Sequence, residues 1–138
     1  AYEQLRAQVS TADLGHISWA IRHGQLGSKD AIRGIAPGLL DRVKQSLNHP
    51  QAAFVLTQVC VISDWHSEDE EPTEQFAEAA ELIVTQYARS PDIGNFCECL
   101  GMGTGSPPWA GSYERHLRTI FEENGDRRVR CAALFALA

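Results

Sequence analysis

The sequence lacks several features that would assign it to a large class of proteins. No apolar run approaches the roughly 18 residues of a membrane-spanning helix, which disfavours an integral membrane protein. Basic residues are the minority, with 12 Lys and Arg against 18 Asp and Glu and a net charge of −6. This balance disfavours general binding to nucleic acid or to an anionic membrane.

Motifs of common catalytic and cofactor sites are also missing. The four cysteines contain no Cys-x-x-Cys pair, so no thioredoxin-type active site is present. The glycine-rich segment 101–106 lacks the Lys-Ser/Thr of a P-loop, and no strand precedes it. No nucleophile lies in a recognisable elbow motif. We therefore expect no metal and no cofactor, and an enzyme is the less favoured class.

The spacing of apolar residues predicts an all-α fold. Apolar side chains recur at helical intervals, and no second strand candidate exists to pair with the β-branched segment 55–62. The expected helices are 11–23, 28–34, 37–48, 52–65, 73–87, 91–100, 112–124 and 126–138, after a short opening segment 2–9. Whether residues 34–38 form a kink or a true break stays open. Thr11, Ser28, Thr73 and Asp126 are the expected N-caps.

Breaks at His49-Pro50, Ser90-Pro91 and Asn124-Gly125 divide the chain into helix pairs. The breaks are 41 and 34 residues apart, in the range of tetratricopeptide and HEAT-type repeats. One helix pair cannot cover its own apolar side and must stack on a neighbour. We therefore expect one domain, residues 1–138, of antiparallel helix-turn-helix pairs in a repeat array or an orthogonal bundle.

The last eight residues, 131–138, are apolar on every side of the expected helix. Such a helix must be covered by something, so we interpret the chain as a fragment of a longer protein. We expect the helix to pack on the preceding pair and to present leftover apolar surface through Leu134, Phe135 and Leu137. The expected partner is a missing C-terminal domain or a second copy, which would make a homodimer.

Five segments carry a family resemblance: APGLL (36–40), NHP (48–50), AAELI (79–83), SPD (90–92) and DRRVRCAALFALA (126–138). They resemble the all-helical region that precedes a thioredoxin-like (redoxin) domain in bacterial thiol-disulfide-exchange proteins. In that group the chemistry belongs to the thioredoxin-like domain, which this chain lacks. The resemblance implies a helical fold and an accessory role as a non-enzymatic scaffold or protein-interaction module. The compartment, cytoplasmic or periplasmic, stays open.

Cys97 and Cys99 carry the alternative function, a redox or metal-binding element. Side chains two residues apart on a helix point about 200° apart, which prevents both thiols from serving one metal. No His lies nearby in sequence to complete a tetrahedral site. We therefore favour Cys97 as a small core residue beside Phe96.

The remaining candidates each have a simpler structural interpretation. His16, Trp19 and His23 form a stripe that we expect to pack on the next helix, and His49 is expected in a turn. His66 lies beside the acidic run 67–72, which we expect to be a solvated loop. Trp109, in a Gly- and Pro-rich loop, either plugs the core, which we favour, or anchors a partner.

A basic patch near the C-terminus defines a third class of function. It comprises Arg115, His116, Arg118, Arg127, Arg128 and Arg130. The patch would suit an acidic protein segment or an RNA phosphate, but it lacks interleaved aromatic residues. Pairing with Glu114, Glu122 and Glu123 explains it more simply, so no nucleic-acid partner is expected.

Overall fold

The computed structural model describes residues 9, 12–25, 29–64, 73–101 and 110–137. This part of the chain forms seven α-helices and a 3-10 turn, with no strand, which confirms the all-α prediction. The elements are α2 (Leu14–Arg22), α3 (Lys29–Lys44), α4 (Ala52–Asp64), α5 (Glu74–Gln86), α6 (Gly94–Gly101), η2 (Ala110–Tyr113), α7 (Glu114–Glu123) and α8 (Arg127–Leu137). None of the described helices has the length and apolar character that crossing a membrane requires.

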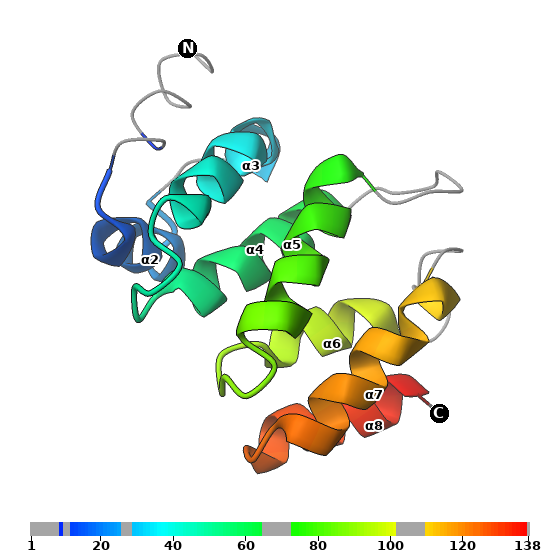
Figure 1. Cartoon of the computed structure of the whole chain (residues 1–138). Coiled ribbons are helices and arrows are strands. Elements are labelled where there is room, and N and C mark those ends of the chain that lie inside the picture. Colours follow the sequence, from blue (N-terminus) through cyan, green and yellow to red (C-terminus); the bar gives the residue numbers. More distant parts are fainter. Residues whose placement is uncertain (1–8, 10–11, 26–28, 65–72, 102–109, 138) are drawn as a thin grey trace.

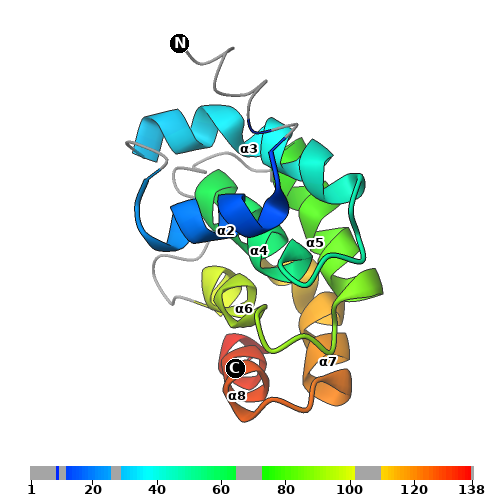
Figure 2. The same ribbon diagram turned by 90° about the vertical axis from the view of Figure 1, so that its left-hand side faces the viewer.

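The helices follow one another in space roughly as they do in sequence. Figures 1 and 2 show α2 and α3 at one end of the molecule and α7 and α8 at the other. The apolar helix α4 is central and packs against α2, α3, α5 and α6. Helix α8 packs on α6 and α7, so its inner side is covered and its outer side faces away from the body.

Side-chain caps fix several helix ends. Thr73 Oγ1 accepts from the backbone N–H of Phe76 at 3.1 Å, which confirms the predicted start of α5. The predicted cap at Thr11 is wrong, because Asp13 Oδ2 accepts from the N–H of His16 at 3.1 Å and starts α2 two residues later. Helix α2 ends at Arg22, and Gly24, just past the C-cap His23, has a φ of 65° that suits a residue without a Cβ.

Two predicted boundaries differ from the structure. Helix α3 runs without a break through Pro37, which resolves the question about residues 34–38 in favour of one helix. Helix α6 begins at Gly94 and not at Pro91, because Ser90 Oγ accepts from the N–H of Asp92 at 3.1 Å and holds a turn there.

An aromatic cluster fills the core between the middle helices. The Phe76 ring lies 6.1 Å from the Phe96 ring and 5.4 Å, edge-on, from the Tyr113 ring, measured between centroids. These rings join α5, α6 and η2, and all three side chains are buried. This core anchors the C-terminal helices on which the candidate site lies.

Candidate functional site

Helix α8 presents one outer face that the rest of the described chain leaves uncovered. We call it the α8 surface and define it by its exposed residues Arg127, Arg128, Arg130, Cys131, Leu134 and Phe135. Asp126 Oδ1 caps the helix by accepting from the N–H groups of Arg128 at 2.9 Å and Val129 at 3.1 Å, as predicted. Val129 and Ala133 on the opposite face are buried, so the orientation of the helix is fixed by packing.

Two large apolar side chains dominate the distal half of the α8 surface. Leu134 is 54% exposed and Phe135 is 78% exposed. The third residue predicted there, Leu137, is half-buried and instead lines a cleft of about 280 Å³ together with Leu100, Gly111, Glu114, Leu117 and Ala136. Exposed Leu134 and Phe135 are therefore the apolar part of the surface, and Leu137 is not.

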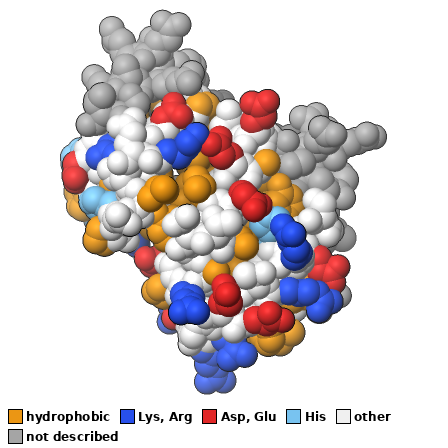
Figure 3. Space-filling view, viewed as in Figure 1, with side chains coloured by type: hydrophobic (Ala, Val, Ile, Leu, Met, Phe, Trp, Pro, Cys, Tyr) orange, Lys and Arg blue, Asp and Glu red, His pale blue; other side chains and the backbone are white. Residues whose placement is uncertain are grey.

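The proximal half of the α8 surface is basic. Its first turn carries three arginines, and the helix contains no acidic residue. Figure 3 shows basic side chains gathered at this end of the molecule. The Arg130 guanidinium lies 4.8 Å from the centroid of the Phe121 ring. Of the predicted pairs with glutamate, the described residues form the one between Arg118 and Glu114, at 2.8 Å.

His116 does not belong to the basic patch. Its Nε2 lies 3.0 Å from Glu81 Oε2 on α5, and its ring lies against Tyr113, 4.9 Å between centroids. Its Nδ1 is buried and has no hydrogen-bond partner among the described residues. The acceptor on Glu81 requires a hydrogen on Nε2, so His116 links α7 to α5.

The cysteines occupy four different environments. Cys60 and Cys97 are buried, Cys99 is half-buried and Cys131 is exposed in the middle of the α8 surface. Burial, together with the Glu98 carboxylate, raises the pKa of the Cys97 thiol to about 12, which disfavours the reactive thiolate. No group of three or more His, Cys, Asp or Glu side chains in the described ranges is placed to hold a metal ion.

The stripe on α2 is exposed, so the prediction that it packs on the next helix is wrong. Trp19 is 50% exposed and stacks between two imidazoles, with ring centroids 4.5 Å from His23 and 6.2 Å from His16. The His23 Nδ1 lies 2.8 Å from the Trp19 carbonyl oxygen. The three rings pack on one another along the helix, while Leu14 and Ile17 face the core.

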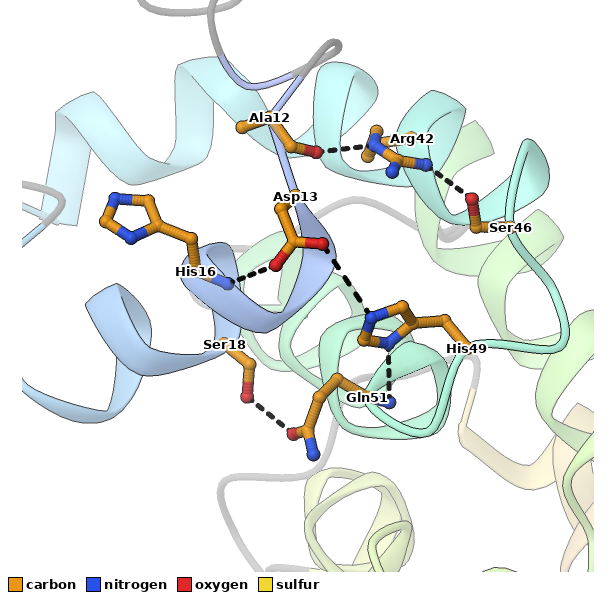
Figure 4. Close-up of polar contacts among 8 residues, drawn as sticks. All are labelled: Ala12, Asp13, His16, Ser18, Arg42, Ser46, His49 and Gln51. Atoms are coloured by element: carbon orange, nitrogen blue, oxygen red, sulfur yellow. Dashed lines mark hydrogen bonds and ion pairs between the residues drawn. The ribbon is translucent and has the colours of Figure 1, made fainter.

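A cluster of polar side chains joins α2 to the turn before α4 (Figure 4). His49 Nδ1 accepts from the N–H of Gln51 at 3.0 Å, and its Nε2 lies 4.0 Å from Asp13 Oδ1. Ser18 Oγ donates to Gln51 Oε1 at 2.7 Å. Both ring nitrogens of His49 face partners, so this residue holds the turn, as predicted.

Several predicted features lie outside the described residues. They are the cap Ser28, His66, the acidic run 67–72, the glycine-rich segment from 102 onward and Trp109. The chain matches no protein-family model, no curated protein and no solved structure in the three comparisons made.

Proposed function

We propose that this chain is a non-enzymatic helical scaffold that binds another protein through the α8 surface. The observation that supports the proposal is the exposure of Leu134 and Phe135 side by side on a helix whose opposite face is packed. Exposing two large apolar side chains to water is unfavourable, and adjacent exposed apolar groups with a charged border are typical of protein-binding sites. Arg127 and Arg128 supply that border about two turns away.

The same proposal includes the architecture and the context suggested by the family resemblance. We propose that the helices form antiparallel pairs in a repeat-like array, which positions α8 at the end of the stack. We further propose that the array is an accessory to a thioredoxin-like domain of a bacterial thiol-disulfide-exchange protein. The reaction then belongs to that domain, and the helical array contributes protein contacts.

The test is a titration of the ¹⁵N-labelled chain with a purified thioredoxin-like domain, followed by NMR. We expect the amide signals of residues 131–137 to shift, and we expect Phe135→Glu to abolish the shifts because it places a charge in the apolar contact. Trp19→Glu is the matched control, since it alters an exposed aromatic residue on α2 instead. The proposed accessory role is wrong if these signals do not move, or if they move equally in Phe135→Glu.

A further inference from the structure

The residues of the α8 surface follow a definite order along the helix. Arg127, Cys131 and Phe135 are spaced four residues apart, so they form one line, with Leu134 beside Phe135. Cys131 is the midpoint of this line. The surface is thus basic at one end, apolar at the other, and carries a small side chain at its centre.

This order makes the surface complementary to itself. If two α8 helices pack antiparallel about Cys131, Arg127 of each copy faces Phe135 of the other. The chain already stacks guanidinium groups on phenylalanine rings, with Arg22 3.8 Å from the Phe54 centroid and Arg130 4.8 Å from the Phe121 centroid. The same contact between copies would bury the Phe135 ring under an arginine.

Electrostatics favours the antiparallel orientation over the parallel one. A parallel pair would place the arginine clusters of both copies together. An antiparallel pair leaves Arg130, which lies over its own Phe121 ring, near the axis. It separates Arg127 of one copy from Arg127 of the other by about 12 Å along the helix, more than a Debye length at physiological salt. It also brings each basic turn to the negative end of the other helix dipole.

The charge of the whole chain favours contact through a face without carboxylates. The net charge of −6 makes two copies repel each other on average. Helix α8 contains no acidic residue, so its outer face is a place where two copies can approach without bringing carboxylates together.

We infer that the α8 surface pairs antiparallel with the α8 surface of a second copy of this chain, around a two-fold axis at Cys131. The inference rests on the proposed function and names the partner. One helix face is smaller than a standard interface, so the dimer is weak. Such a dimer would bring two accessory arrays, and whatever domains they carry, close together.

The experiment is sedimentation velocity of the full chain from about 5 to about 500 µM, a range that brackets a weak dimer. We expect the weight-average sedimentation coefficient to rise with concentration in the wild type. It should stay at the monomer value in Phe135→Glu and rise less in Arg127→Glu. Trp19→Glu, at the other exposed aromatic residue, should behave as the wild type. Circular dichroism of each variant checks that it is folded.

Cys131 gives a second readout of the same geometry. Because the two-fold axis passes at Cys131, mild oxidation of the concentrated protein with copper phenanthroline should produce a disulfide-linked dimer. Cys131→Ser should not form it, and Phe135→Glu should form much less. A covalent dimer that persists in Cys131→Ser would place the contact elsewhere and overturn the inference.

The results of these experiments can contradict the pairing of two α8 surfaces without contradicting the proposed function. A wild-type chain that stays monomeric over the whole range, or a dimer unaffected by Phe135→Glu, overturns the pairing. If the NMR titration still shifts residues 131–137, the α8 surface binds a different protein and the proposed function stands. If neither a second copy nor the thioredoxin-like domain binds there, both fail.

Discussion

Asn124, between α7 and α8, is hydrogen-bonded to Ser90, between α5 and α6. The Asn124 Nδ2 donates to the Ser90 carbonyl at 2.7 Å and to the Ala88 carbonyl at 2.9 Å, and its Oδ1 accepts from the N–H of Asp126 at 2.8 Å. The side chain is buried, and all its bonds go to backbone groups. One asparagine therefore joins two turns and sets the position of the hairpin that carries the α8 surface.

Replacing Asn124 should lower the stability of the folded chain. Asn124→Ala leaves the carbonyls of Ala88 and Ser90 without their donor, and we expect a loss of about 2–4 kcal/mol in the free energy of unfolding. Asn124→Asp keeps an acceptor for Asp126 but cannot donate, so it should also destabilise. Urea denaturation measures both, with the exposed Asn95→Ala as control. Equal stability of Asn124→Ala and Asn95→Ala would show that these bonds contribute nothing.

Phe76 and Trp19 lie in different environments, so replacing each with alanine should lower the stability by different amounts. Phe76→Ala removes a fully buried ring that contacts Phe96 and Tyr113, and it should cost about 3–5 kcal/mol. Trp19→Ala removes a larger ring that is half-exposed and stacks on two histidines, and it should cost roughly 1 kcal/mol or less. Denaturant unfolding of both variants measures the two losses in the free energy of unfolding. A Trp19→Ala chain as unstable as Phe76→Ala would mean that the α2 stripe packs against the body after all.

Stability should fall in alkaline solution. The pKa of Cys97 is raised from 9.0 to about 12 in the folded chain, so the unfolded chain loses its proton first. Between about pH 9 and pH 12 this thiol therefore costs roughly 1 kcal/mol of stability per pH unit. Burial also raises the pKa of Tyr87 and of Tyr113, which act in the same direction.

Cys97→Ala should flatten this alkaline dependence, although it lowers stability near neutrality by leaving a small void. The measurement is the free energy of unfolding by urea at pH 8, 9 and 10, values chosen around the roughly 8.5–9 pKa of a free thiol. Cys131→Ala, at an exposed position, should leave the slope unchanged. A wild-type slope no steeper than that of Cys97→Ala would show that burial does not hold this thiol neutral.

The redox alternative predicts a different thiol chemistry from the scaffold proposal. In the folded, dilute chain we expect iodoacetamide to modify Cys131 first and Cys99 more slowly, with Cys60 and Cys97 protected until the chain unfolds. Peptide mass mapping after timed labelling gives the order. Fast labelling of Cys97, or a Cys97–Cys99 disulfide that forms and is reduced reversibly in the native chain, would favour a redox element.

Local patterns in the sequence predicted the features that depend on neighbouring residues. The helical spacing of Phe76, Ala80 and Ile83 and the cap at Thr73 define α5, and the apolar run 131–137 indicates that α8 has more apolar surface than its neighbours cover. The exposed residues Leu134 and Phe135 follow from that excess, because only one side of a helix can face the core.

Features that depend on distant residues could not be predicted in this way. In the sequence Asn124 indicates only a break between helices, because its hydrogen-bond partners lie 34 and 36 residues away. The α2 stripe, His16, Trp19 and His23, recurs at helical spacing just as Leu14 and Ile17 do, so spacing alone does not tell which set is buried. Which face packs is decided by α4, whose position no local pattern specifies.

The most direct test of the proposed interaction surface is the rate at which iodoacetamide alkylates Cys131. If the α8 surface binds a protein, the rate should fall as the surface is covered, either by raising the concentration of the chain or by adding the thioredoxin-like domain. In Phe135→Glu the rate should stay constant under both conditions. A wild-type rate that is the same under every condition would contradict the account, because it would show that nothing covers this face.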